Sequence, residues 1–441
     1  MTETQSSDPI SPGLQRVAKK AKDSPGLAFT TLAHHINVDL LRVAHRRTRR
    51  DGAVGIDGLT SADFDRDLES NLQGLLDRAK SGRYRAPAVR RVLIPKGDGR
   101  KRPIGIPTHE DKVLQRGVAM VLEPIYEQDF LPCSFGFRPN RSAHGALSAL
   151  REGLMSMRGG WVIEADIRDF FGTLDHSRLR EILRQRVQDG VVLRLIGKWL
   201  QAGVLENGRH HRPLSGTPQG GVISPLLANV YLHEVLDLWF HQEVLPRMRG
   251  AAFLVRYADD FVIAFEREDD ALRVHDVLPK RFAKYGLELH PDKTRLLDFR
   301  RPRFGVGKGT ASFDLLGFTH YWGKSRRGAS VIKRKTMKAR LCRALRATSQ
   351  WCRAHRHDPI ELQHAALSRQ IRGHCAYYGI TGNARSLAVF RYMVLEIWRK
   401  WLRRRSNKAR KGWQWWHQLQ ERYPLPPARV VHSTYRPTAR P

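Results

Sequence analysis

The sequence predicts an α+β fold, in which helices back an antiparallel sheet and a helical bundle follows. Between residues 161 and 298, apolar runs and amphipathic stretches follow the order strand, helices, strand, strand, helix, strand. That order is typical of a split β-α-β motif. Residues 253–265, FLVRYADDFVIAF, have the pattern of two half-buried strands joined by a tight turn. After residue 325 the patterns become helical and strongly basic.

Charge gives the first indication of a partner. The 441 residues carry a net charge of +34, with 77 basic and 43 acidic side chains. The excess positive charges repel one another, so a polyanionic partner is expected. Nucleic acid is the first candidate and an anionic membrane surface the second. No apolar run approaches the roughly 20 residues that span a bilayer. The four cysteines form no CxxC pair, and no signal-peptide pattern begins the chain, so we expect a reduced, cytoplasmic protein.

Composition divides the chain near residue 325. Residues 321–441 hold 28 basic and 4 acidic side chains and seven of the ten tryptophans. We therefore predict a sheet-containing region followed by a basic helical one. The expected parts are a disordered lead (1–27), the sheet-containing region (28–325), a helical domain (326–405) and a basic, Trp-rich tail (406–441).

Helical and hairpin patterns fill these regions. Residues 89–95 and 102–107 predict a hairpin with Lys96 and Arg102 near its tip, and residues 312–321 predict another. In isolation, the first hairpin is best interpreted as an ordinary basic hairpin. If it lies beside an active site, Lys96 and Arg102 would contact phosphates. Helical patterns cover 28–50, 61–75, 111–126, 144–157, 177–200, 222–244, 268–285, 333–351, 360–378 and 390–402.

Three carboxylates carry the chemical argument. Asp166 lies near the end of the apolar run 161–167, and Asp259 and Asp260 lie at the tip of the 253–265 hairpin. On a split β-α-β sheet these acids would converge, although an isolated Asp-Asp is more often turn chemistry. Converging acids imply hard divalent ions, Mg²⁺ or Mn²⁺, and a pair of such ions supports phosphoryl transfer. The glycine-rich loop 214–221 opens a helix and suits a nucleotide.

At these residues the chain resembles the reverse transcriptase/maturase proteins of bacterial group II introns, across roughly residues 30–435. Such proteins have a right-hand polymerase fold with fingers and palm, followed by a helical thumb, or maturase, domain. The motifs that carry the resemblance are GIDG (55–58), IPKGDGRKRPIGIP (94–107), SFGFRPNRSAH (134–144), EADIRDFFGTLDH (164–176), GTPQGGVISPLLANVYL (216–232), RYADDFVI (256–263), PDKT (291–294) and LLGF (315–318).

The resemblance implies a role for each matching position. Asp166, Asp259 and Asp260 would bind two metal ions, helped by the Ile167 carbonyl. Lys96 and Arg102 would contact the triphosphate. The remaining positions would be Phe171 under the sugar, Ala258 and Gln219 in the nucleotide and template pocket, Lys293 as proton donor to pyrophosphate, and Gly317 and Phe318 in the primer grip. Phe171, Lys293 and Phe318 have equally simple structural interpretations, since an aromatic residue after a strand is usually core.

The basic C-terminal region resembles the thumb of the same family. Its motif RGHCAYY (372–378) departs from the common RGWxxYY pattern, because His374-Cys375 replaces Trp-Ala. Helical basic faces could follow a phosphate backbone. The residues that we expect to contact RNA are Arg334, Lys335, Lys338, Arg372, Arg403, Arg404 and Arg405. No Cys-pair or His-Asn-His-like cluster follows, so no endonuclease domain is expected.

Three functions are compatible with these patterns. The first is an intron-encoded RNA-directed DNA polymerase that also binds its intron RNA and assists its splicing and mobility. The second is a domesticated relative in phage defence or DNA repair, and the third is an RNA-binding maturase without polymerase activity. The retained acids disfavour the third, and the retained basic thumb favours the first over the second. The expected partners are an RNA template, a DNA primer or target and dNTPs; oligomeric state stays open.

Overall fold

A computed structural model describes residues 11–95, 101–206, 209–211, 220–302, 311–405 and 412–433. The chain divides into two compact units, which are described separately. Unit 1 comprises residues 1–146 and 162–296, and unit 2 comprises residues 147–161 and 297–441. The division falls after Leu296 rather than at the expected residue 325. The second predicted hairpin therefore belongs with the C-terminal helices.

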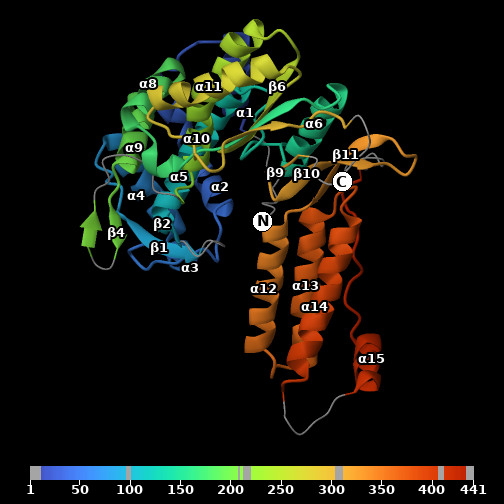
Figure 1. The fold of residues 1–441 in the computed structure, drawn as a ribbon. Helices are drawn as coiled ribbons and strands as arrows, with labels where there is room; N and C mark the ends of the chain where they lie inside the picture. Colours follow the sequence, from blue (N-terminus) through green and yellow to red (C-terminus); the bar gives the residue numbers. More distant parts are fainter. Residues whose placement is uncertain are drawn as a thin grey trace. The chain divides into compact units, whose positions relative to one another are not determined.

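Unit 1 contains a mixed set of helices and two sheets (Figure 1). Its helices are α1(Pro12–Asp23), η1(Ala33–His35), α2(Val38–Arg46), α3(Ser61–Asp65), α4(Leu68–Ser81), α5(His109–Asp129), α7(Phe170–Thr173), α8(His176–Arg186), α9(Gly190–Leu200), α10(Ser224–Leu232), η2(His233–Leu238), η3(Phe240–Val244), η4(Leu245–Arg247) and α11(Glu268–Lys284). Its strands are β1(Val89–Pro95), β2(Lys101–Ile106), β4(Val204–Glu206), β5(Arg209–His211), β6(Ala252–Tyr257) and β7(Asp260–Phe265). Three elements cross the division: α6(Ala143–Ser156), β3(Trp161–Asp166) and β8(Arg295–Asp298).

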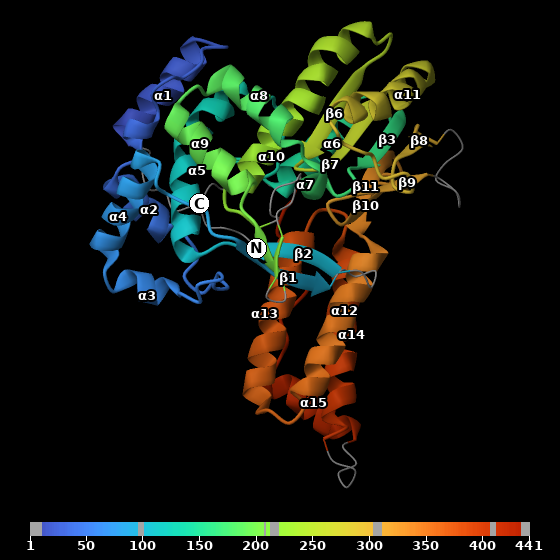
Figure 2. The ribbon, with the colours of Figure 1, turned by 90° about the vertical axis from the view of Figure 1, so that its left-hand side faces the viewer.

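The sheet that carries the acids has the order β6-β7-β3-β8 (Figure 2). Strands β6 and β7 are antiparallel, and Tyr257 pairs with Asp260 at their tip. The residues of β7 after Asp260 are all buried, as the apolar run FVIAF predicts. Strand β3 lies beside β7, so the end of β3 and the tip of the hairpin belong to one sheet. The predicted sheet is confirmed in its strands, although the last strand begins at Arg295 after a short turn.

A second sheet in unit 1 has the order β2-β1-β4-β5. Strands β1 and β2 form the predicted antiparallel hairpin, with Ile94 opposite Arg102. Its tip, which includes Lys96, lies outside the described residues. Strands β4 and β5 were not predicted, because each is three residues long.

Several helices differ from the predicted ranges. The lead over 1–27 was expected to be disordered, but residues 12–23 form α1, which buries Leu14, Val17 and Ala21. The helix expected over 28–50 begins only at Val38, because the Asn37 side chain accepts a hydrogen bond from the Leu40 amide and caps it.

Two long predicted helices are interrupted. The helix expected over 177–200 is broken between α8 and α9, where Asp189 caps the second. The helix expected over 222–244 begins as α10 and continues in wider π-helical turns. The hydrophobic periodicity therefore predicted that these segments are helical, but it did not predict where one helix ends and the next begins.

Unit 2 combines a three-stranded sheet with a helical bundle (Figure 1). The sheet has the order β11-β10-β9, and the bundle packs around buried Leu367, Val394 and Trp398. Its elements are β9(Ser312–Leu315), β10(Phe318–Lys324), β11(Ser330–Thr336), α12(Lys338–Ala354), α13(Ile360–Tyr378), α14(Ala384–Leu402) and α15(Trp413–Arg422).

Two expectations for unit 2 need correction. Residues 330–336 form a strand paired with β10, so the helix expected from residue 333 begins at Lys338. Part of the expected tail over 406–441 folds as α15, whose Trp416 and Leu419 are buried against Trp398. Among the described residues, no helix is both long and apolar enough to cross a membrane.

Candidate active site

The turn between β6 and β7 consists of two residues, Ala258 and Asp259. Ala258 is buried and has a φ of 57°, a left-handed conformation that L-residues with a side chain rarely adopt. Asp259 is partly buried, and Asp260 is exposed as the first residue of β7. The turn therefore carries Asp259 at the cost of an unfavourable backbone conformation at Ala258.

Asp166 and Asp259 interact through their charges. Burial raises the pKa of Asp259, and the negative charge of Asp166 raises it further. The charges of Arg102 and Lys293 act in the opposite direction. Lys293 donates a hydrogen bond of 2.5 Å from Nζ to Oδ2 of Asp166. The two acids and two bases thus form one electrostatic group that joins β3, the β6–β7 turn, β2 and the segment before β8.

The acidic pair suits a hard divalent cation. Its ligand atoms would be carboxylate oxygens, and the Lys293 ammonium already supplies positive charge at Asp166. Within the described residues, no group of three or more His, Cys, Asp or Glu side chains is arranged to hold a metal ion. The structure therefore brings Asp166 and Asp259 together as a pair, while the predicted third ligand, Asp260, is exposed beside them.

The positions around Asp166 have defined backbones. Ile167 is buried and bridges to Leu289, and the Asp166 carbonyl accepts a hydrogen bond from the His290 amide at 2.8 Å. Phe171 is partly buried and lies edge-to-face against buried Phe170, with ring centroids 5.2 Å apart. A half-exposed ring on α7, which begins four residues after Asp166, is compatible with contact to a sugar.

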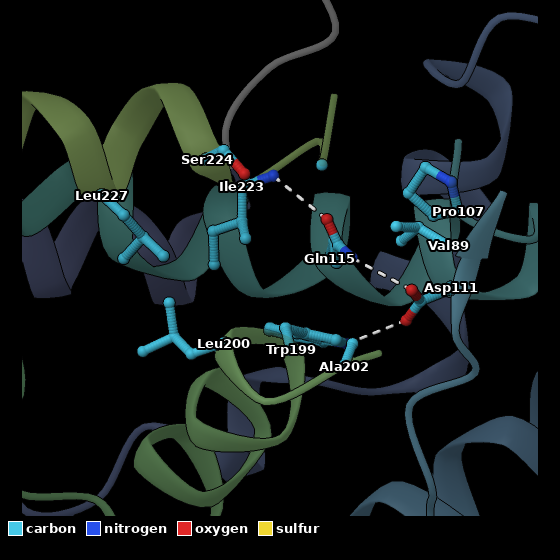
Figure 3. Close-up of a pocket in the computed structure, with 11 residues that line it drawn as sticks. Val89, Pro107, Asp111, Gln115, Trp199, Leu200, Ala202, Ile223, Ser224 and Leu227 are labelled. Carbon is cyan, nitrogen blue, oxygen red and sulfur yellow. Dashed lines mark hydrogen bonds between the residues drawn. The ribbon is translucent and has the colours of Figure 1, made fainter. Parts of the chain in front are cut away.

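A small pocket lies at the start of α10 (Figure 3). Asp111, Gln115 and Trp199 line one side of it. The amide of Gln115 donates to Asp111 Oδ2 at 3.1 Å and accepts from the Ile223 backbone amide at 3.4 Å. Figure 3 shows this chain of hydrogen bonds from α5 to the residue before α10. It ties Ile223, two residues after the glycine-rich loop, to α5, and Gln219 of that loop lies outside the described residues.

Sequence reasoning gave no role to Asp111, which is buried on α5. Burial raises its pKa to about 6, although hydrogen bonds from Tyr84, Trp199 and Gln115 partly offset that effect. Nor did it give one to Arg256, a fully buried cation three residues before Asp259. For Arg256 the available signal was a charged residue within an otherwise apolar run, because such residues are rarely buried without partners. Asp111 lies between Glu110 and Lys112 and offered no such signal.

The predicted primer-grip residues lie at a second hairpin turn, in unit 2. Gly317 has a φ of 79°, and it follows Leu316 with a φ of 52°. Phe318 is fully buried against Leu147 and Ile380. Its side chain therefore serves the core, and any contact with a primer would come from the turn itself.

The seven expected RNA-binding residues fall into two groups. Arg334 is buried on β11 opposite His320, and Arg405 donates hydrogen bonds to the carbonyls of Arg356 and Asp358. The side chains of Arg334 and Arg405 are therefore engaged within the protein itself. The other five are exposed: Lys335, Lys338, Arg372, Arg403 and Arg404.

Comparisons with known proteins identify relatives across most of the chain. A family model described as reverse transcriptase (RNA-dependent DNA polymerase) matches residues 94–320. The group II intron-encoded protein LtrA of Lactococcus lactis subsp. cremoris is 28% identical over 86% of this chain and 76% of its own length. Protein YkfC of Escherichia coli is 38% identical over 47% of this chain and 62% of its own. Nuclear intron maturase 2 of Arabidopsis thaliana is 28% identical over 44% and 30%.

Proposed function

The chain belongs to the reverse transcriptase (RNA-dependent DNA polymerase) family, and we propose that its polymerase site is built on Asp166 and Asp259. The family's reaction is RNA-directed DNA synthesis, and its members generally depend on divalent metal. The observation that carries the site is the coupling of the two carboxylates, from β3 and the β6–β7 turn, beside Arg102 and Lys293.

Each residue of this group has a distinct task. Asp166 and Asp259, with Asp260 and the Ile167 carbonyl beside them, would hold two Mg²⁺ ions. When bound, such ions activate a primer 3′-hydroxyl and stabilise the leaving pyrophosphate. Arg102 would bind the triphosphate of the incoming dNTP, because its planar guanidinium makes paired contacts with phosphate oxygens. Lys293, held at Asp166, would deliver a proton to pyrophosphate.

The pocket residues complete the proposal. Phe171 would pack under the deoxyribose, since its ring is only partly buried. Lys96 would join Arg102 at the phosphates, and Gln219 would contact the nucleotide from the loop that precedes Ile223, which Gln115 binds. Ala258 would border the base through its backbone.

For the RNA partner we propose a group II intron transcript. The relatives include proteins named as a group II intron-encoded protein and an intron maturase, and the first is matched over most of its length. Unit 2 adds an electrostatic reason, because exposed Lys338, Arg372 and Arg403 lie on or directly after its helices. Such a contribution should weaken steeply as salt is added.

Primer extension tests the polymerase site. Wild-type protein, an RNA template, a DNA primer, dNTPs and Mg²⁺ should give cDNA, and a chelator should abolish it. Asp259→Asn should give no product while still binding the RNA, because it removes one charge of the acidic pair. Asp276→Asn, on the exposed face of α11, is the matched control and should behave as wild type. Folded wild-type protein that binds RNA without making cDNA would contradict the proposed polymerase.

A further inference from the structure

Arg256 is a fully buried cation at the base of the turn that holds Asp259. Each of its five N–H groups has an acceptor. Nε and Nη2 donate to the two carboxylate oxygens of buried Asp237, at 2.7 and 2.6 Å. The other bonds go to Asn229 Oδ1 (2.9 Å), Ser134 Oγ (2.8 Å) and the Ala258 carbonyl (3.1 Å).

The bond to Ala258 connects this network to the active site. The Ala258 carbonyl and the Asp259 amide belong to the same planar peptide group, so a donor on that carbonyl restricts the orientation of the Asp259 backbone. Ala258 needs such restriction, because a positive φ is unfavourable for a non-glycine residue and persists only when its surroundings enforce it.

The opposite side of the turn is held by the segment at residues 133–136. The amide of Arg256 donates to the Cys133 carbonyl, and its own carbonyl accepts from the Phe135 amide. Gly136 lies so close that a Cβ there would stand 2.4 Å from the Ala258 nitrogen. Asn229 joins the two sides, because its Nδ2 donates to the Gly136 carbonyl at 2.7 Å while its Oδ1 accepts from Arg256.

We propose that Arg256 is a positioning residue, which fixes the Asp259 carboxylate for metal binding through the Ala258 peptide. The inference rests on the proposed polymerase site. Stability alone is a weak reason for this arrangement, since a buried ion pair often contributes no more than apolar side chains of similar volume. What an apolar replacement would lack is the directed bond to the turn.

The test compares two buried arginines of unit 1. Arg256→Lys keeps the charge but offers three donors for five acceptors. The matched control is Arg186→Lys, because Arg186 on α8 also pairs with an aspartate, Asp129, and with backbone carbonyls, but does not contact the turn. Both substitutions should lower the melting temperature. Primer extension is then measured below both transitions, on folded protein, over a range of dNTP and Mg²⁺ concentrations.

The positioning role predicts a specific kinetic pattern. Arg256→Lys should lower kcat by roughly 10- to 100-fold, because small misplacements of a catalytic group have effects of that order. It should also raise the Mg²⁺ concentration for half-maximal rate, and leave RNA binding within about threefold, since uniform binding of the RNA is not affected. Arg186→Lys should change none of these values on folded protein.

The outcomes separate the inference from the function on which it rests. No cDNA from wild-type protein would overturn the polymerase site itself. An active wild type, with Arg256→Lys matching Arg186→Lys in kcat and Mg²⁺ requirement, would overturn the positioning role alone. If Arg256→Lys does not fold, Asn229→Ala takes its place, because it removes one acceptor of Arg256 and the bond to Gly136; the same two results then decide.

Discussion

Two hairpin turns of this protein each begin with a non-glycine residue of positive φ and differ in their second residue. In the β6–β7 turn, Ala258 has a φ of 57°, and its carbonyl accepts a bond from Arg256. In the β9–β10 turn, Leu316 has a φ of 52°, and its carbonyl accepts a bond from the Tyr377 hydroxyl at 2.9 Å. Each turn therefore pairs an unfavourable first residue with a side-chain donor.

The second residue distinguishes the two turns. In unit 2 it is Gly317, whose φ of 79° costs glycine little, so the turn has the sequence chemistry of a type I′ hairpin. In unit 1 it is Asp259, which the proposed chemistry requires. Asp259 does not have a positive φ, so the unfavourable conformation of this turn lies at Ala258, whose carbonyl is held by Arg256. The difference indicates that the β6–β7 turn depends more on tertiary contacts, and the β9–β10 turn more on its own glycine.

The largest expected effect follows from crowding the catalytic turn. In Gly136→Ala the new Cβ would meet the Ala258 nitrogen at 2.4 Å, a distance that real Cβ atoms do not show. Either the turn or the segment around residue 136 must move, so we expect the rate of primer extension to fall by about 100-fold. RNA binding, measured by filter retention, should be unchanged.

Gly190→Ala is the control for this substitution. Gly190 is the first residue of α9, and a Cβ there meets no atom within 4 Å. This variant should extend primers at the wild-type rate. If Gly136→Ala also extended primers at the wild-type rate, the β6–β7 turn would depend on its surroundings no more than the β9–β10 turn, which contains Gly317.

Much of the fold could be predicted because its signals are local. The apolar runs on both sides of Asp259 indicated the β6–β7 hairpin, and the proline and glycines after residue 94 indicated the β1–β2 hairpin. The errors arose where partners are distant. Asp189 ends one helical pattern because it caps α9 and also accepts bonds from the Leu32 and Ala33 amides, more than 150 residues earlier. The basic sequence of β11 was predicted to be the start of a helix, and only its pairing with β10 shows that it is a strand.

The same distinction applies to the site. Strand ends and a turn were enough to predict that Asp166 and Asp259 lie together, and the structure supports that pairing. The motif containing Arg256 was recognised without a role for the arginine, because its partner Asp237 lies 19 residues earlier, on η2. Two opposite charges in apolar segments could have indicated a buried pair, but only the structure shows that the pair contacts the turn.

Asp237, which is paired with a buried arginine, and Asp111, which is buried among neutral partners, offer a second comparison with a smaller expected effect. Burial alone would raise the pKa of Asp237, but the charge and hydrogen bonds of Arg256 lower it below its ordinary value. In the described part of the chain Asp111 accepts hydrogen bonds from the neutral side chains of Tyr84, Gln115 and Trp199, and its pKa is raised to about 6. Its folded form thus holds a proton more tightly than its unfolded form. The stability that protonated Asp111 contributes should be lost as pH rises through about 6.

Urea unfolding of wild type and Asp111→Asn measures this loss. From about pH 4.5 to pH 8, the free energy of unfolding of wild type should fall by about 2 kcal/mol relative to the variant, because a pKa shift of two units has that order of effect. Asp276→Asn, on an exposed face, should show no such pH-dependent difference. A constant difference between wild type and Asp111→Asn at all pH values would mean that Asp111 is not held protonated by burial.

The smallest effect is expected at the turn in unit 2. Tyr377→Phe removes the donor to the Leu316 carbonyl and should lower the free energy of unfolding by about 1 kcal/mol, the usual net contribution of one hydrogen bond. Because Gly317 accepts its conformation without help, the turn should keep its shape and folded protein should extend primers at nearly the wild-type rate. Tyr392→Phe, on the exposed face of α14, controls for loss of a hydroxyl. If Tyr377→Phe reduced kcat as much as Arg256→Lys, the two turns would depend on their donors equally, and the distinction between local and tertiary control would fail.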